Sequence, residues 1–163
     1  MITNLIEFVE SLVRPLRILV VDCDPSTSRL VKQYLSPYHV EICSATCACP
    51  AIAKIKNGFI PDLTFLASPL TPLGRAVFVL EDIIRNCPRT RVVIVADSQD
   101  EEGVVEMMKL GSFTFLKKGS TLDTSHVQRL AGQLNIKLRS SGDASKEIPI
   151  VTNVETVNCN HCI

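Results

Sequence analysis

The chain has no excess of charge of either sign. Its 163 residues carry 17 basic and 17 acidic side chains, which gives a formal net charge of +0 at pH 7. A neutral chain has no global field that draws it to nucleic acid or to anionic lipid. No window approaches the ~20 apolar residues of a membrane span, and no basic segment followed by an apolar core marks a secretory signal. We therefore expect a cytoplasmic protein without nucleic-acid or membrane partners.

The chain also lacks the pattern of a disulfide framework. Its cysteine count is odd, at seven, and 46% of its residues are hydrophobic, which is enough for a core that needs no bridges. This usage fits reduced thiols in a cytosol. Cys159 and Cys162 have the Cys-x-x-Cys spacing, but structural zinc usually takes two such pairs and no second pair is evident. We expect no metal and no other cofactor.

What the chain does contain is an alternation of short apolar strands and amphipathic helices. The strands are predicted over residues 16–21, 39–44, 63–67, 91–96 and 113–116. The helices are predicted to run from a cap at Asp24 or Ser26 to about 35, over 51–56, 77–84 and 101–110, and from 123 or 124 to 138. This alternation indicates an α/β fold with helices on both faces of a five-stranded parallel sheet. Right-handed crossovers restrict it to a few doubly wound forms.

Several polar or small residues stand where these strands end. In doubly wound sheets the functional crevice lies outside the carboxyl ends of the strands. The residues at these ends are Asp22, Cys23, Asp24, Ala67, Ser68, Ala96, Asp97, Lys117 and Lys118. No Gly-rich phosphate loop follows the first strand, so a flavodoxin-like enzyme or nucleotide binder is disfavoured.

Three segments that carry these strand ends resemble the response-regulator receiver (CheY-like) family. Residues 18–25 (ILVVDCDP) resemble its first strand and acidic cluster, residues 61–67 (PDLTFLA) its third strand, and residues 109–118 (KLGSFTFLKK) the end of its fourth helix and its fifth strand. The resemblance covers roughly residues 16 to 138. It implies the strand order 2-1-3-4-5 and a pocket in which an aspartate that ends the third strand takes a phosphoryl group.

The chain keeps only part of the phosphorylation pocket that this resemblance implies. Asp22 matches the first of two acids that help to hold Mg²⁺, but Cys23, a soft ligand, replaces the second. Ala67 stands at the phosphoacceptor position, Ala96 stands at a Thr/Ser position, and Lys118 matches the lysine that ends the fifth strand. The degenerate pocket comprises Asp22, Cys23, Asp24, Ala67, Ala96 and Lys118. Because alanine has no nucleophile, the resemblance implies a pseudo-receiver that is not phosphorylated at this position.

Neighbouring residues do not replace the missing aspartate. Asp62 lies five residues before Ala67 on the same strand, and at about 3.3 Å per residue this places it roughly 16 Å away. Ser68 is adjacent, but successive strand residues point to opposite faces, and its hydroxyl is a weak nucleophile without a base. We expect Lys118 and Asp22 to pair across the vacated pocket, because pairing keeps two partly buried charges compensated.

We expect a non-enzymatic signalling adaptor of two-component or phosphorelay systems that acts by protein–protein interaction. In the family the fourth helix, fifth strand and fifth helix form the usual partner surface, and Phe115 matches an aromatic position involved in switching. Met107 and Met108 also lie in this region, and methionines suit an adaptable surface. The partner would be a kinase or an output protein. The alternative for the helix is that Met108 and Val104 simply pack on the sheet.

The segments outside the receiver-like region add two further expectations. Apolar residues recur at helical spacing over residues 1–15 and predict an amphipathic helix that packs on the domain, binds a partner or forms a homodimer. Residues 139–163 are expected to form a weakly structured tail that is too short for a DNA-binding output domain.

A thiol-based redox sensor on the same fold is the alternative function. Cys47 and Cys49 lie before or in the first turn of the second helix, a position that favours thiolates, and Cys23 lies near Lys118. On this hypothesis oxidant changes the conformation or the oligomeric state, and Cys→Ser substitution abolishes the change. An adaptor instead binds its partner in both redox conditions.

Overall fold

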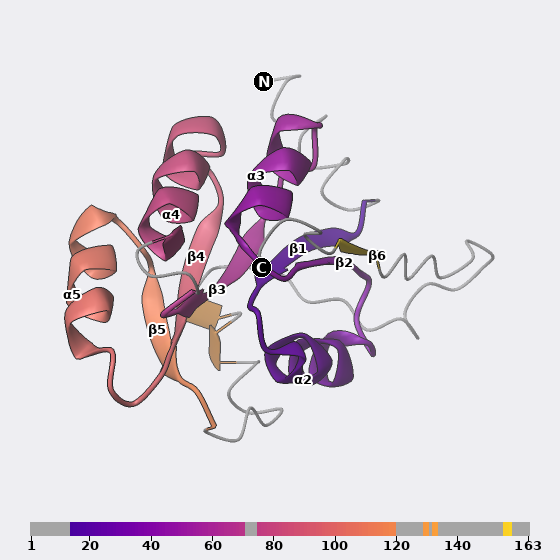
Figure 1. Ribbon diagram of the computed structural model, residues 1–163. Helices are drawn as coiled ribbons and strands as arrows, with labels where there is room; N and C mark the ends of the chain where they lie inside the picture. Colours follow the sequence, from indigo (N-terminus) through magenta and orange to yellow (C-terminus); the bar gives the residue numbers. More distant parts are fainter. Residues whose placement is uncertain (1–13, 71–74, 120–128, 131, 134–154, 158–163) are drawn as a thin grey trace.

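The computed structural model describes residues 14–70, 75–119, 129–130, 132–133 and 155–157 (Figure 1). The predicted N-terminal helix over residues 1–15 and the predicted last helix over residues 123–138 therefore lie mostly outside the described residues. The described part of the chain forms one parallel sheet with helices packed on both of its faces. No helix within this part is long and apolar enough to cross a membrane.

All paired strands of the sheet are parallel, and their order is β5-β4-β3-β1-β2-β6. The strands are β1 (Leu16–Val21), β2 (Val40–Ala45), β3 (Leu63–Ser68), β4 (Arg91–Ala96), β5 (Thr114–Lys117) and β6 (Glu155–Val157). The first five confirm the predicted doubly wound sheet with the order 2-1-3-4-5. Because the strands all run the same way, the ends that carry the candidate residues meet at one edge of the sheet.

The helices divide between the two faces of this sheet. The described helices are α2 (Pro25–Leu35), α3 (Ala48–Lys56), α4 (Arg75–Asn86) and α5 (Glu101–Leu110). Helices α3, α4 and α5 share a buried apolar cluster with one face, whereas α2 and Leu130 pack on the other face. Figure 1 shows this division, with α2 on the side of the sheet opposite α3 and α4.

Strand β1 shows why the strands are continuous apolar runs in the sequence. Leu19 and Val21 are buried in the cluster beneath α3 and α4, and Ile18 and Val20 are buried in the cluster beneath α2. A strand that is buried on both faces needs apolar residues at consecutive positions. At roughly 1.5–3 kcal/mol for each fully buried aliphatic side chain, such runs supply a large part of the driving force for folding.

Short polar and glycine signals determine where helices α2 and α5 begin and end. Asp24 caps α2 by accepting a hydrogen bond from the backbone N–H of Ser26 at 2.9 Å, with Pro25 at the start of the helix. Gly111 ends α5 with a φ of +115°, a left-handed conformation that favours glycine. These caps hold the loop after β1 and the turn before β5 in place, and both lead to the candidate site.

The C-terminal segment contributes the short strand β6, which has no clear signal in the sequence. It extends the predicted five-stranded sheet beyond β2. The register against β2 is Cys43 opposite Glu155, Ser44 opposite Thr156, and Ala45 opposite Val157. The two strands are too far apart in sequence for local periodicity to reveal their pairing. Residues 139–154 and 158–163 lie outside the described residues, so the weak structure expected of them stays a prediction.

Candidate functional site

Asp22 provides a buried carboxylate at the carboxyl edge of the sheet. It follows β1 directly, and its backbone N–H donates to the carbonyl of Ala45 on β2 at 3.1 Å. Only 1% of its side chain is exposed. One carboxylate oxygen accepts a hydrogen bond from Thr27 Oγ1 at 2.5 Å, and the other accepts one from the backbone N–H of Asp24 at 2.9 Å. The fold therefore holds a negative charge at the position predicted from the strand ends.

Lys118 balances this charge from the end of β5. Its backbone N–H donates to the carbonyl of Ala96 at 2.6 Å, which continues the pairing of β4 and β5 by one residue. Its Nζ lies 3.2 Å from Asp22 Oδ2 and 3.6 Å from Asp24 Oδ2. The predicted pair between Asp22 and Lys118 is confirmed. A protein cation is thus already paired with Asp22, the acid that the family resemblance assigns to Mg²⁺.

The contacts among Asp22, Asp24 and Lys118 shift the pKa of Lys118 and the pKa of Asp24. Burial alone lowers the pKa of Lys118, but the hydrogen bond to Asp22 and the attraction of Asp22 and Asp24 outweigh it, so the pKa is raised above its ordinary value. The pKa of Asp24 is lowered, chiefly by hydrogen bonds from Ser26 and further by Lys118. Both shifts favour the charged forms, so Lys118 and Asp24 remain ionised at neutral pH.

The two alanines at the reactive positions are core residues. Ala67 on β3 is 2% exposed and Ala96 at the end of β4 is 4% exposed, and both belong to the cluster beneath α3, α4 and α5. They lie on neighbouring strands, where Ala67 pairs with Val95 and Ser68 pairs with Ala96. Neither alanine side chain offers an oxygen atom or a nucleophile. Methyl groups therefore stand where the resemblance implies a phosphoryl acceptor and a hydroxyl that binds it.

Ser68 ends β3 one residue beyond the predicted limit and is engaged in a different contact. It is buried, its hydroxyl donates to the carboxylate of Asp100, and its carbonyl accepts the backbone N–H of Asp97 at 2.9 Å. Gly103 on α5 leaves room for this carboxylate, since a Cβ there would lie 2.5 Å from Asp100 Oδ1. Sequence reasoning missed Asp100, although an acid just before a helix is a recognisable capping signal.

Asp62 lies at the opposite edge of the sheet, as its distance along β3 predicts. Its carboxylate accepts two hydrogen bonds from the Arg14 guanidinium, at 3.0 and 2.8 Å, and one from the backbone N–H of Arg17, at 2.9 Å. These contacts tie the start of β1 to the start of β3. Asp62 therefore has a structural role and cannot replace the missing acceptor at Ala67.

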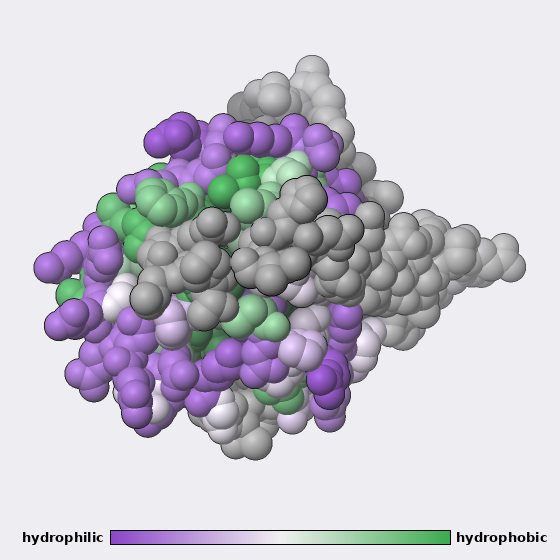
Figure 2. All heavy atoms as spheres, in the orientation of Figure 1, coloured by the Kyte–Doolittle hydropathy of each residue, from purple (hydrophilic) through white to green (hydrophobic). Residues whose placement is uncertain are grey.

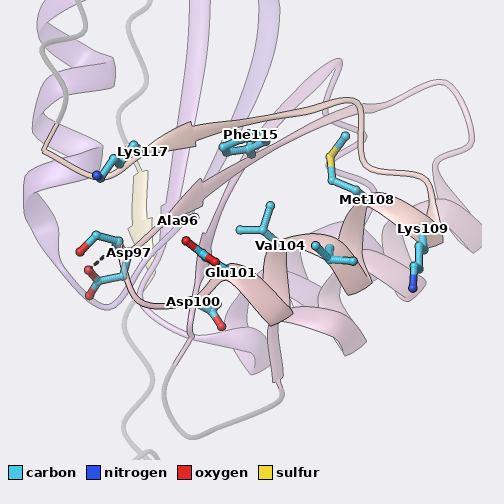
Figure 3. A pocket seen from close by; sticks show the side chains of 11 residues that line it. Ala96, Asp97, Asp100, Glu101, Val104, Met108, Lys109, Phe115 and Lys117 are labelled. Atoms are coloured by element: carbon cyan, nitrogen blue, oxygen red, sulfur yellow. Dashed lines mark hydrogen bonds between the residues drawn. The ribbon is translucent and has the colours of Figure 1, made fainter.

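A groove with a volume of about 680 Å³ lies between α5 and β5 (Figure 3). Its apolar lining includes Val104, Val105, Met108 and Phe115. Its charged lining includes Asp97, Asp100, Glu101, Lys109 and Lys117. Figure 3 shows Lys117 and Lys109 at opposite ends of the groove, with Phe115 between them. Ala96 lines the groove as well as the degenerate pocket, so the two sites are contiguous.

The exposed fractions of the groove side chains correct one prediction. Phe115 is 52% exposed and Met108 is 38% exposed, and both line the groove. Met107 is 1% exposed and belongs to the buried cluster. Its assignment to the partner surface is therefore wrong. Successive residues on a helix are about 100° apart, and the methionine that faces the sheet is Met107 rather than Met108.

The described cysteines differ in their access to solvent. Cys23 and Cys49 are exposed, whereas Cys43, Cys47 and Cys87 are buried. Cys47 occupies the N-cap position of α3 without a side-chain capping hydrogen bond, and Cys49 lies in the first turn of that helix. Among the residues that the structure describes, no three His, Cys, Asp or Glu side chains form a group that could hold a metal ion.

A second apolar surface lies over helix α4. Phe78 is 61% exposed and Ile84 is 40% exposed on this helix. Figure 2 shows apolar surface in the region of α4, bordered by hydrophilic side chains. Ile84 reaches the turn after α5, because a Cβ at Gly111 would lie 3.7 Å from its Cδ1. The apolar surface of α4 therefore extends to the carboxyl end of α5.

Comparison with solved structures finds response-regulator receiver domains. The receiver domain of NtrX from Brucella abortus is 26% identical with a TM-score of 0.63, and the match covers 74% of this chain and 99% of that domain. A CheY-like receiver domain protein from Methanospirillum hungatei JF-1 is 23% identical with a TM-score of 0.65, covering 74% and 94%. A response regulator from Thermotoga maritima is 20% identical with a TM-score of 0.64, covering 76% and 99%. No family model and no curated protein matches the chain.

The fold is that of a response-regulator receiver domain. It agrees with the resemblance of the three sequence segments, and the neighbours support a response-regulator-like signalling domain. Within this receiver fold, the chain has Ala67, Ala96 and Lys118 at the carboxyl edge of the sheet.

Proposed function

We propose that the chain is a phosphorylation-independent signalling adaptor, a degenerate receiver that acts through protein–protein contacts rather than by catalysis. The observation that carries this proposal is Ala67, a methyl group that is 2% exposed at the position where the family resemblance implies an acceptor aspartate. An acyl phosphate needs a carboxylate oxygen as the nucleophile. Alanine supplies none.

The charged and polar side chains near Ala67 are already bonded to one another, which fits a pocket with a single conformation. Lys118 forms an ion pair with Asp22 and lies 3.6 Å from Asp24, so one ammonium group lies beside both carboxylates of the acidic cluster. The nearby Ser68 hydroxyl donates to Asp100, which ties it to the start of α5. A pocket with these bonds in place has no need of a phosphoryl group to complete its interactions.

The coupling that the family uses between its phosphorylation pocket and its partner surface is also altered in this chain. In the family, a Thr or Ser at the end of the fourth strand and an aromatic residue on the fifth strand switch together. Here the first position is Ala96, which has no hydroxyl, while Phe115 is 52% exposed in the groove. Without the hydroxyl, phosphoryl binding cannot draw the aromatic side chain inward by the usual route. We infer that Phe115 is continuously available to a partner.

The groove between α5 and β5 is suited to a protein partner. It combines an exposed aromatic side chain and an adaptable methionine with charged residues at both ends. Buried aromatic anchors with a polar surround are typical of the residues that dominate binding energy at protein interfaces. The expected partner is a signalling protein such as a kinase or an output protein.

Phe115→Ala tests this assignment. A partner captured from host lysate and then purified is expected to bind Phe115→Ala roughly tenfold or more weakly than the wild-type chain. Ile60→Ala is the matched control, because Ile60 is 55% exposed, similar to Phe115, and precedes β3 at the opposite edge of the sheet. Adding an acyl phosphate donor is expected to leave the affinity unchanged. Equal loss in both variants, or binding that requires the donor, would contradict the proposal.

A further inference from the structure

We propose that the chain forms a homodimer through the solvent-facing side of helix α4, with the two α4 helices packed antiparallel about a two-fold axis. Phe78, Glu81, Ile84 and Arg85 of each protomer form the centre of this interface. The inference goes beyond the adaptor function and does not depend on it. It rests on exposed apolar side chains and on a charge pattern that is complementary to a second copy of itself.

Helix α4 turns one side to the sheet and the opposite side to solvent. It packs between α3 and α5 (Figure 1), and Leu80 and Ile83 are fully buried beneath it. Successive residues of a helix are about 100° apart, so Phe78, Glu81 and Arg85 lie within an arc of about 60° on the other side. All three side chains are exposed. They form a stripe along α4 that a second molecule can reach.

Two large apolar side chains of α4 are exposed to solvent. Phe78 is 61% exposed, more than Phe115 in the groove at 52%, and Ile84 is 40% exposed. Ile84 lies on the flank of α4 that faces α5, because a Cβ at Gly111 would lie 3.7 Å from its Cδ1. Exposed apolar surface with a charged surround is typical of protein interaction sites, and its burial favours association.

Glu81 and Arg85 carry opposite charges on the same stripe, one helical turn apart. Their spacing would allow an ion pair within the helix, yet neither side chain has a hydrogen bond or an ion pair with a residue that the structure describes. In an antiparallel pair of α4 helices, each acid lies opposite a base. Parallel packing would place like charges together. The charges therefore favour a second copy as the occupant and an antiparallel arrangement.

The positions of these two charges also set the register of the helices. When the two-fold axis crosses α4 at the level of Ile83, Glu81 lies opposite the partner's Arg85, and the symmetry repeats this pair on the other side of the axis. A shift of one helix by a turn separates both pairs. Opposite charges therefore fix the register, as charged positions do in paired helices.

This register gives each exposed apolar side chain of α4 an apolar neighbour. Phe78 lies at the level of the partner's Pro88, which is exposed just beyond the end of α4. The axis runs across both helices, so the flanks that face α5 in the two protomers lie on the same side of the interface. Ile84 then lies beside the partner's Ile84. The interface thus combines two ion pairs with apolar contacts at its ends and along one flank.

The size of α4 predicts a weak dimer that leaves the groove open. The helix has 12 residues and is about 18 Å long, so a pair of such helices buries less than the ~1,200–2,000 Å² of a standard interface. We expect a dissociation constant on the order of 10 µM or higher. No residue of α4 lines the groove between α5 and β5. If the proposed adaptor function holds, the dimer presents two such grooves to its partners.

Sedimentation equilibrium of the intact chain tests this proposal, from about 5 to about 500 µM in a phosphine reductant that prevents disulfide cross-links. The wild type is expected to show a monomer–dimer equilibrium that weakens as salt screens the ion pairs. Glu81→Arg and Arg85→Glu are each expected to weaken it roughly tenfold or more, because each places like charges opposite one another. Arg29→Glu is the matched control and is expected to keep the dimer, since Arg29 is exposed on α2, on the other side of the sheet.

Exchange of the two charges separates a specific interface from a general effect of charge. Glu81→Arg/Arg85→Glu in one chain restores opposite charges across the axis and is expected to dimerise like the wild type. A mixture of the two single variants is expected to form a heterodimer, because two arginines of one chain face two glutamates of the other. Phe78→Ala keeps the charges and is expected to weaken the dimer roughly tenfold.

Three results overturn the proposal. The first is a wild-type chain that stays monomeric at about 500 µM. The second is a dimer that the single charge reversals do not weaken, or that Arg29→Glu weakens equally. The third is a mixture of the single variants that stays monomeric. Circular dichroism of each variant distinguishes loss of the dimer from loss of the fold. Failure of Phe115→Ala to weaken partner binding would contradict the adaptor function alone, since Phe115 lies outside α4.

Discussion

Lys118 supplies the ammonium group that compensates the acidic cluster at the carboxyl edge of the sheet. Its removal leaves the buried carboxylate of Asp22 without a counter-charge. We expect Lys118→Met to lower the free energy of unfolding by about 1–3 kcal/mol, less than for a fully buried pair because 28% of the lysine side chain is exposed. Urea denaturation measures the change, with Lys56→Met as an exposed control. An unfolding free energy equal to that of the wild type would show that the pair contributes no stability.

The same residue predicts how stability varies at high pH. The pKa of Lys118 is raised in the folded chain above its ordinary value of 10.5, so the folded state holds this proton more tightly than the unfolded state. Its contribution is complete below the unfolded pKa and is lost as pH rises through the folded pKa. The stability difference between wild type and Lys118→Met is expected to stay constant from about pH 7 to about pH 10 and to shrink at higher pH. A difference that increases with pH would contradict this assignment.

Residues at strand ends were predictable, whereas contacts between separate loops were not. Asp22 and Lys118 each follow a strand directly, and parallel strands bring such residues to one edge. Met107 and Met108 are adjacent on α5, and a small error in helix phase exchanges the buried residue for the exposed one. The contact between Ser68 and Asp100 joins the end of one strand to the loop after another, and periodicity says nothing about the path of that loop.

The amino end of helix α5 is tied to the end of β3 by the hydrogen bond from Ser68 to Asp100. Gly103 permits this bond, since a Cβ there would lie 2.5 Å from the carboxylate. Gly103 lies in the first turn of α5, where alanine is normally more stable than glycine by at most the ~0.8–1.0 kcal/mol of a helix interior. We expect Gly103→Ala not to show this increase in stability. The added methyl group displaces the carboxylate, and the buried Ser68 hydroxyl loses its partner at a cost of about 1–3 kcal/mol.

Asp100→Ala provides the background that isolates this effect. In that background no carboxylate opposes the methyl group, so Gly103→Ala is expected to raise the free energy of unfolding by up to about 1 kcal/mol. Chemical denaturation of the four proteins in the cycle gives the coupling between the two positions. The same effect of Gly103→Ala in both backgrounds would show that Gly103 is not needed to accommodate Asp100.

At the scale of whole elements, the apolar periodicity identified the first five strands and located the four described helices. Their boundaries differ by a few residues from the prediction: α3 begins at Ala48, after Cys47, although the apolar pattern points to residue 51. Strand β6 was not predictable, because three residues carry no periodic signal and their partner β2 lies near the other end of the chain.

In the molecule as a whole, one edge of the sheet combines the degenerate pocket with an adjoining groove. Ala67 and Ala96 fill the pocket with methyl groups, Lys118 neutralises its acids, and Phe115 remains exposed in the adjoining groove. The alternation of strands and helices was sufficient to predict the fold. The resemblance pointed to Phe115 and Met108 as surface residues, but the groove that they line was not predicted, because its lining comes from β4, α5 and β5 together.

The central claim is that this receiver fold signals without phosphorylation, and the intact mass of the chain after incubation with acetyl phosphate and Mg²⁺ tests it most directly. A receiver domain that carries the acceptor aspartate serves as the positive control in the same reaction. We expect the control to gain the mass of a phosphoryl group and the wild-type chain to keep its original mass, because Ala67 offers no oxygen to form an acyl phosphate. Gain of an acid-stable or hydroxylamine-labile phosphoryl group by the wild-type chain would contradict the claim.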